Sequence, residues 1–276
     1  MEPRDRSVLV TGASRGIGRA TAERLSQTGW TVFAGVRTAA DAPAGTTPVV
    51  LDLTDEAQIA SLADAVPDRL DAVVNNAGVV VAGPVEALTA DDLRRQFEIN
   101  VIGQIAVTRA LLPKLRASRG RIVFVSSVSG RISTPMTGVY SASKYALEAL
   151  ADAMRVELRP WGVTISLVEP GAIDTDMWKT APEMIEETYA ALAPEYRELY
   201  DGHVAGMRKT VRFIQKQASP PATVVAAVEK ALTASRPKAR YVVGADSRAQ
   251  LAAKAVLPTA AFDAIIARGT GTPKSS

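Results

Sequence analysis

Residues 7–18 read SVLVTGASRGIG, an apolar run followed by a turn with three glycines. A helical stretch, Ile17–Gln27, follows directly. Glycines permit a tight turn in which a phosphate can approach backbone N–H groups, and the helix N-terminus adds favourable partial charge for an anion. The spacing is Gly-x3-Gly-x-Gly, unlike the Gly-x-Gly-x-x-Gly of other dinucleotide-binding turns. Because a plain strand-to-helix turn needs at most one glycine, this stretch predicts a phosphate-binding turn after a first strand, Ser7–Val10.

The rest of the chain alternates β-branched apolar runs with helical stretches. Further strands are expected at Thr31–Ala34, Pro48–Leu51, Ala72–Val74, Arg121–Ser126, Thr164–Val168 and Arg240–Val243. Further helices are expected at Glu56–Ala65, Ala90–Ala117, Tyr140–Arg159 and Thr223–Ala234. Several strands are apolar almost throughout, as in a parallel sheet that is covered on both faces. The alternation predicts a doubly wound α/β fold with right-handed crossovers.

One segment, Asp176–Ser219, interrupts the alternation and looks helical but irregular. It contains three of the six tyrosines and three of the six methionines of the chain. Long inserts in α/β domains are often lids or binding loops, and a subdomain with its own core is an alternative that can hold at the same time. We therefore expect a helical lid insert at 176–219 within a single domain that spans 1–276. A tail, 269–276, is expected to be disordered.

Composition excludes several classes of protein. The 276 residues include no cysteine and a single histidine, His203, and carry a formal net charge of +3. Without cysteine there are no disulfides or thiolate metal sites, which fits a cytoplasmic location. One histidine cannot build a zinc centre, and no serine motif points to it, so no metal site is expected. The basic residues are scattered and do not interleave with aromatic residues, which argues against nucleic-acid binding.

The sequence predicts no membrane span. No uninterrupted apolar run reaches the roughly 18 residues that a spanning helix needs, and the charged first six residues lead into no signal-peptide core. The segment Ala249–Ala267 is apolar. It is expected to dock on the core or on a partner subunit, with association at a membrane surface as the alternative.

Tyr140 and Lys144 lie four residues apart in the run YSASK. Positions i and i+4 of a helix share one face, and a nearby ammonium favours the phenolate and lowers the pKa of a tyrosine. A tyrosine so placed can donate or accept a proton at a carbonyl or alcohol oxygen. The alternative is a solvated helix face that carries both residues by chance.

Four motifs together resemble the short-chain dehydrogenase/reductase family. They are the glycine turn, Asn75-Asn76-Ala77-Gly78, Tyr140-x-x-x-Lys144 and Pro170-Gly171, and they keep the family's order over residues 7–175. The resemblance implies a single Rossmann-type domain, with a doubly wound parallel sheet of seven strands and helices on both faces. It also implies an oxidoreductase that transfers hydride between a nicotinamide cofactor and an alcohol/carbonyl pair.

The resemblance also implies a catalytic set. Tyr140 matches the acid/base, and Lys144 matches its partner, which also holds the nicotinamide ribose. Ser127 matches the serine that hydrogen-bonds to the substrate oxygen, with its neighbour Ser126 as the alternative. Asn100 matches the helix asparagine that helps to hold a water-mediated proton path, and an asparagine that bonds locally to its own helix backbone is the alternative.

NADP(H) is the expected cofactor. NAD-specific Rossmann proteins carry an acidic residue after the second strand, whereas here Arg37 follows that strand and Arg15 lies in the glycine turn. Guanidinium groups suit the 2′-phosphate, although a merely solvated Arg37 is an alternative. The residues expected at the cofactor are Gly12, Ser14, Arg15, Gly16, Ile17, Gly18, Arg37, Asp52, Leu53, Asn76, Ala77, Gly78, Tyr140, Lys144, Pro170, Gly171, Ile173 and Thr175.

The insert predicts an apolar substrate surface because it is rich in methionine, tyrosine, tryptophan and isoleucine. The residues expected at the substrate are Ser127, Tyr140, Met177 and Trp178. Ser235–Gly244 and Leu257–Thr259 resemble the hydroxysteroid and retinol dehydrogenase branch of the family. This second resemblance implies a small lipophilic alcohol or carbonyl substrate that is steroid-, retinoid- or fatty-aldehyde-like.

Two other functions remain open at this point. One is a non-catalytic NADP(H)-binding sensor or scaffold, although such proteins commonly lose the tyrosine or the lysine. The other is a nucleotide-sugar epimerase or dehydratase, which usually has another glycine spacing and a larger C-terminal domain. The family resemblance also implies a homodimer or homotetramer that associates through the helices expected at Ala90–Ala117 and Tyr140–Arg159.

Overall fold

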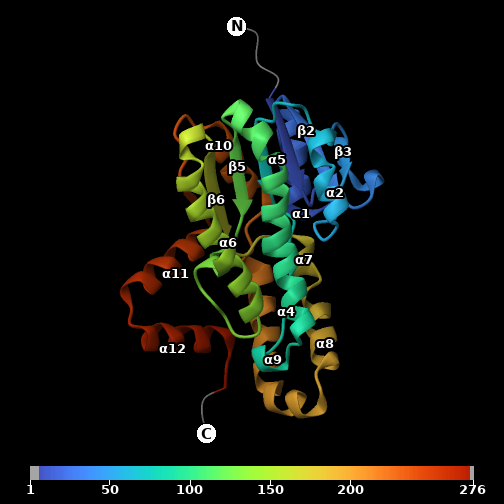
Figure 1. Cartoon of the computed structure of the whole chain (residues 1–276). Helices are drawn as coiled ribbons and strands as arrows, with labels where there is room; N and C mark the ends of the chain where they lie inside the picture. Colours follow the sequence, from blue (N-terminus) through green and yellow to red (C-terminus); the bar gives the residue numbers. More distant parts are fainter. Residues whose placement is uncertain (1–5, 274–276) are drawn as a thin grey trace.

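The expected doubly wound sheet is confirmed in the computed structural model, which describes residues 6–273. Seven parallel strands pair in the order β3-β2-β1-β4-β5-β6-β7 (Figure 1). The strands are β1 Arg6–Thr11, β2 Trp30–Val36, β3 Thr47–Val50, β4 Ala72–Asn75, β5 Arg121–Val125, β6 Thr164–Pro170 and β7 Arg240–Val243. Each strand lies where the apolar runs predict it.

Helices connect and follow the strands. They are α1 Gly16–Gln27, α2 Glu56–Ala60, α3 Leu62–Ala65, α4 Ala90–Phe97, α5 Gln104–Ser118, α6 Gly138–Glu157, α7 Asp176–Lys179, α8 Ala181–Ala191, α9 Pro194–Gln217, α10 Pro221–Thr233, α11 Ala245–Val256 and α12 Thr259–Thr270. Short 3-10 turns are η1 Ala39–Asp41, η2 Val85–Ala87, η4 Val128–Gly130 and η5 Arg159–Trp161, and η3, Glu98–Gly103, is a π-helical turn.

Two of the expected helices are interrupted. The helix expected at Glu56–Ala65 breaks at Ser61, whose hydroxyl donates to the carbonyl of Gln58 at 2.9 Å. Such a local side-chain bond competes with the helical backbone pattern. The helix expected at Ala90–Ala117 is divided into α4 and α5 by the π-helical turn η3. Turns of this kind occur mostly as single interruptions, frequently at functional sites.

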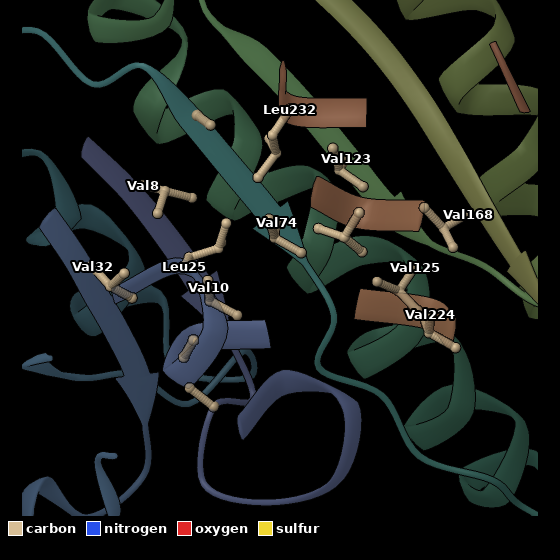
Figure 2. Close-up of a cluster of buried hydrophobic side chains, with 14 of the residues drawn as sticks. Val8, Val10, Leu25, Val32, Val74, Val123, Val125, Val168, Val224 and Leu232 are labelled. Atoms are coloured by element: carbon tan, nitrogen blue, oxygen red, sulfur yellow. The ribbon is translucent and has the colours of Figure 1, made fainter. Parts of the chain in front are cut away.

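Both faces of the sheet are buried, which explains the nearly continuous apolar strands. Because side chains alternate along a strand, Val8 and Val10 of β1 face one side, where Leu25 of α1 packs beside them (Figure 2). Val224 of α10 belongs to the same core and lies near Val125 of β5. Leu9 faces the opposite side and belongs to the core formed with α5 and α6. The two cores hold the sheet rigidly between two helical layers.

The strand order places the functional edge. The chain leaves β1 toward β2 and β3 and returns to β4 on the other side of β1, so the order reverses between β1 and β4. Ligands of open α/β sheets bind at the carboxyl ends of the strands at such a reversal. The glycine turn after β1 and the asparagines at the end of β4 lie at this point.

The segment Asp176–Ser219 forms helices α7, α8 and α9, which extend beyond the carboxyl ends of the strands in Figure 1. They share a small core in which Met136 of the main body packs with Ile185 and Val204. The hydroxyl of Tyr200 on α9 also donates to a carboxylate oxygen of Glu86 at 2.7 Å. The insert therefore has a core of its own and is attached to the main body at its rim.

The C-terminal segment differs from its expectation. The apolar stretch expected at 249–267 forms two helices, because Pro258 caps the start of α12. The tail expected to be disordered from residue 269 onward is wrong for its first residues, because α12 continues to Thr270. Residues 274–276 of that tail lie outside the described part of the chain. Here α12 packs on α9: the Thr210 hydroxyl donates to the carbonyl of Gly269 at 3.2 Å, and a Cβ on Gly206 would lie 2.5 Å from the carbonyl oxygen of Thr270.

In the described part of the chain, no helix combines the length and the apolar character that crossing a membrane requires.

Candidate active site

The glycine turn between β1 and α1 is built on close backbone contacts. Gly12 and Gly16 have φ angles of +65° and +57°, a region that side chains rarely enter. A Cβ on Gly18 would lie 2.2 Å from the carbonyl oxygen of Gly12 and 2.4 Å from the side-chain nitrogen of Asn76. The first turn of α1 therefore rests directly on the loop, and only glycine fits at position 18.

Thr11, the last residue of β1, joins the turn to the end of β4. Its hydroxyl oxygen accepts hydrogen bonds from the backbone N–H groups of Asn76 at 3.0 Å and Ala77 at 3.1 Å. In return, the side-chain amide of Asn76 donates to the carbonyl of Thr11 at 3.0 Å. The sequence reasoning missed this role of Thr11, although a hydroxyl residue directly before the first glycine was the available signal.

The residues at this edge fit a phosphate-bearing cofactor. The first turn of α1 contains no acidic residue, and the N-cap residue Arg15 makes no side-chain capping bond, so the N–H groups of this turn remain available to an anion. The side chains of Arg15 and Arg37 are both exposed. Arg37 contributes to lowering the pKa of Asp52, although hydrogen bonds from Thr54 are the larger cause. Positive charge therefore lies beyond the carboxyl ends of β1 and β2.

Asn100 is fully buried in the π-helical turn, and its side chain forms hydrogen bonds with residues that are distant in sequence. Its side-chain oxygen accepts the backbone N–H of Val79 at 2.8 Å, and its amide donates to the carbonyl of Val79 at 2.9 Å. The amide also donates to the hydroxyl of Ser143 at 3.2 Å. The alternative of local bonding to its own helix is therefore wrong. Asn100 links the loop after β4 to α6, and Ser143 is a partner that the sequence reasoning did not identify.

Ser127, Tyr140 and Lys144 gather at the carboxyl end of β5. The hydroxyl of Ser127 accepts the N–H of Ser129 at 3.1 Å and donates to the carbonyl of Pro170 at 3.4 Å. The ammonium of Lys144 donates to the carbonyl of Val125 at 2.9 Å and lies 5.9 Å from the centre of the Tyr140 ring. The three functional groups therefore come from the loop directly after β5 and from α6.

The hydroxyl of Ser126 lies elsewhere. It is buried, has no hydrogen-bond partner in the described part of the chain, and lies 2.9 Å from the position of a Cβ on Gly130. The hydroxyl of Ser127 instead interacts with the side chain of Tyr140. This arrangement favours Ser127 over Ser126 as the residue that faces a substrate.

Burial is the largest cause of the pKa shifts of Tyr140 and Lys144. It raises the pKa of Tyr140, and a hydrogen bond with Ser127 lowers that pKa in part. Burial also lowers the pKa of Lys144 to about 8, against the nearby charge of Glu148. The expectation that the ammonium lowers the pKa of Tyr140 below its ordinary value is therefore not met, because desolvation disfavours the phenolate more strongly.

The loop after β6 faces the glycine turn. A Cβ on Gly16 would lie 3.8 Å from the side chain of Thr175, and Ile173 is buried and bridges to Ser219. Gly171 contacts the start of α11. This geometry brings the expected cofactor loops to one edge.

Of the two lid residues expected at the substrate, Trp178 is half-buried and packs against the core of the lid. The side chain of Met177 lies outside the described residues.

Comparison with known proteins agrees with this geometry. A family model described as short chain dehydrogenase matches residues 6–186. An NADPH-dependent 3-dehydrocapnine reductase of Ornithobacterium rhinotracheale is 34% identical, over 94% of this chain and 95% of that protein. Retinol dehydrogenase 5 of Mus musculus is 35% identical, over 95% of this chain and 88% of that protein. A Burkholderia cenocepacia short chain dehydrogenase solved in complex with NADP is 26% identical with a TM-score of 0.75, over 99% of this chain and 100% of that chain.

Replacing Gly18 by alanine tests the glycine turn. The added Cβ meets backbone that cannot move away easily, so we expect Gly18→Ala to weaken binding of a nicotinamide dinucleotide by about tenfold or more in a fluorescence titration with NADPH and with NADH. Gly269→Ala is the matched control, because its Cβ would meet nothing within 4 Å. Equal NADPH affinity in the two variants would contradict the structural role of Gly18.

The match to the family model covers more than half of the chain, the relatives align over nearly its whole length, and the expected resemblance to retinol dehydrogenases is confirmed. The chain belongs to the short-chain dehydrogenase family of oxidoreductases.

Proposed function

We propose that the protein interconverts an alcohol and a carbonyl on a small lipophilic substrate with NADP(H). The observation that carries the proposal is the convergence of Ser127, Tyr140 and Lys144 at the carboxyl end of β5, on the same edge of the sheet as the glycine turn. A hydroxyl, a phenol and a buried ammonium at one edge are the groups that acid/base chemistry at a carbonyl oxygen requires.

When bound, NADP(H) supplies or accepts the hydride, and the protein supplies orientation and electrostatics. During reduction the substrate oxygen gains negative charge. The hydroxyls of Ser127 and Tyr140 donate hydrogen bonds to that oxygen and stabilise the developing charge. The Ser127 hydroxyl is free to do so because its present bond to Pro170 is long, at 3.4 Å.

Tyr140 then transfers its proton to the substrate oxygen and becomes a phenolate. Burial holds this proton on the tyrosine at neutral pH, so the acid form needed for reduction is the resting form. The ammonium of Lys144 offsets the charge of the phenolate once it forms. Asn100 positions the surrounding backbone through Val79 and supports α6 through Ser143. The reverse reaction requires the phenolate as base.

The lid supports a lipophilic substrate. Its buried and half-buried side chains are mostly aromatic or aliphatic, and they pack with Met136, which lies between Ser127 and Tyr140 in sequence. An apolar insert of this kind at the rim of the site favours an apolar ligand. The similarity to a retinol dehydrogenase points in the same direction. We place the substrate between the insert and Tyr140, with Trp178 among the residues that contact it.

A substrate panel tests the reaction and the residue together. Steroids, retinoids, aldehydes and ketones are incubated with NADPH, and its absorbance is followed. We expect turnover on at least one lipophilic carbonyl. Tyr140→Phe removes the proton donor and is expected to lower kcat by a factor on the order of 100 to 10,000. Tyr145→Phe on the same helix is the control and keeps normal kcat. Full activity in Tyr140→Phe would refute the assigned role, and no turnover on any substrate would favour the sensor or scaffold function.

Preference for NADP(H) over NAD(H) rests on charge. Arg37 follows β2 directly and Arg15 caps α1, so both lie at the edge that a 2′-phosphate would reach. The residue directly after β2 is thus an arginine and not the acidic residue that would repel that phosphate. The similarity to an NADPH-dependent reductase and to a structure holding NADP supports this preference.

Replacing Arg37 tests the cofactor preference. In wild-type protein kcat/KM is expected to be higher with NADPH than with NADH. Arg37→Ser removes one charged hydrogen-bond donor and is expected to lower kcat/KM for NADPH about tenfold, close to the value of one charged hydrogen bond, with little change for NADH. Arg95→Ser, at an exposed position on α4, is the control. A clear preference of the wild-type protein for NADH would contradict the proposed preference for NADP(H).

Self-association through α5 and α6 is also proposed. These helices form a surface pocket of about 510 Å³. Its lining is apolar at Ile105, Leu112, Leu150, Met154, Leu158 and Trp161 and charged at Arg109, Arg116 and Glu157. Trp161 is 50% exposed and Ile102 is 53% exposed on the preceding π-helical turn. An apolar patch of this kind on paired helices is typical of an interface.

A charge placed in this patch tests the association. Leu150→Glu puts a carboxylate among apolar side chains, so we expect the dimer or tetramer to dissociate to a monomer in size-exclusion chromatography with light scattering. Leu199→Glu makes the same change at a position that is 66% exposed on α9 and serves as the control. A monomeric wild-type protein, or an unchanged mass in Leu150→Glu, would contradict this interface.

A further inference from the structure

A buried charged network lies behind Lys144 that the proposed proton transfer does not use directly. Glu148 follows Lys144 by one turn on α6, and the two residues are only 5% and 4% exposed. Glu169 on β6 is fully buried. Buried charges are unfavourable unless they are paired and hydrogen-bonded, so their partners show what holds them in place.

Arg240 of β7 connects the two glutamates. Its Nε lies 2.9 Å from Oε2 of Glu148 and 3.1 Å from Oε1 of Glu169, and its Nη2 lies 2.7 Å from Asp152. Arg131 approaches the other oxygen of Glu169 at 3.4 Å. Arg240, on the edge strand β7, therefore holds the Glu148 carboxylate in place by an ion pair.

The network touches the loop that carries Ser127. A Cβ on Gly130 would lie 2.9 Å from Cγ of Glu148 and 3.2 Å from the carbonyl oxygen of Lys144. The second oxygen of Glu148, Oε1, is buried and has no hydrogen-bond partner in the part of the chain that the structure describes. The carboxylate is thus held through one oxygen, Oε2, which binds Arg240, while its other oxygen is buried.

The electrostatic effect on Lys144 has a definite sign. Burial lowers the pKa of Lys144, and the carboxylate of Glu148 raises it. The charged groups that surround Glu148 come from every element packed against it. They are Lys144 and Asp152 of α6, Glu169 of β6, Arg240 of β7 and Arg131 of the loop after η4.

We propose that Glu148 is a positioning residue that keeps Lys144 charged as an ammonium, and that Arg240 holds the Glu148 carboxylate in place for this task. The proposal rests on the proposed role of Lys144 beside Tyr140. A purely structural network would clamp α6 to β6 and β7 without affecting the titration of Lys144. The two possibilities therefore differ in a property that can be measured in the free protein.

The direct test is NMR titration of protein labelled with ¹³C-lysine, with the Lys144 signal identified by its loss in Lys144→Arg. In Glu148→Gln the pKa of Lys144 is expected to fall by about one unit relative to wild type, as expected for the loss of a close opposite charge. Glu148→Asp keeps the carboxylate and is expected to restore most of the shift. Glu157→Gln makes the same substitution at an exposed position of α6 and is expected to leave the titration unchanged.

An unchanged or higher pKa of Lys144 in Glu148→Gln overturns the proposal, as does an equal shift in Glu157→Gln. If Glu148→Gln does not fold, Glu148→Gln combined with Arg240→Gln removes both members of the ion pair. A smaller downward shift is then expected, because loss of the positive charge of Arg240 by itself raises the pKa of Lys144. This titration needs no substrate, so it can fail while Tyr140→Phe still abolishes turnover, and the reverse can also occur.

A pH profile of kcat/KM for reduction gives the second readout. Reduction requires the protonated tyrosine and the ammonium, so activity falls as pH rises through the titration of Lys144. Glu148→Gln is expected to move this alkaline limb to lower pH by about one unit, with activity below the limb retained. An alkaline limb at the wild-type pH in a folded Glu148→Gln protein contradicts the proposal.

Discussion

The parallel pairing of β1 with β4 determines where every functional group of this protein lies. Val8, Leu9 and Val10 run beside Ala72, Val73 and Val74, so both strands end at the same level. The connections that follow leave in opposite directions, which opens the sheet edge between them. Thr11 and Asn76 then bind one another across this opening, and the helix start at Gly18 is pressed against both. The cofactor edge thus follows from one strand register.

The acid/base pair illustrates a balance between burial and charge. Removing Tyr140 and Lys144 from water favours the neutral form of each, so the phenol keeps its proton while the lysine tends to lose its own. To keep a neutral phenol beside a charged ammonium, the protein must therefore offset the effect of burial on the pKa of the lysine but not on that of the tyrosine. The Glu148 carboxylate acts in this direction, and it requires Arg240 because a second buried glutamate, Glu169, lies nearby.

The sequence predicts features that depend on local spacing, and it does not predict those that depend on tertiary contact. The seven strands follow from apolar runs, and the shared face of Tyr140 and Lys144 follows from helical periodicity. The partners of Asn100, by contrast, lie in another loop and another helix. The direction of the Tyr140 pKa depends on burial, which spacing does not reveal. The ordered start of the tail at Gly269 likewise depends on packing against α9.

The contact between the C-terminal helix and the lid has a mechanical consequence. Gly206 on α9 leaves no room for a side chain beside Thr270 and Gly271, so α12 and α9 are joined backbone to backbone. Any movement of α9 away from the sheet must then move α12 as well, because the two helices are in direct backbone contact. A probe attached to α12 would therefore report any movement of α9 relative to the sheet.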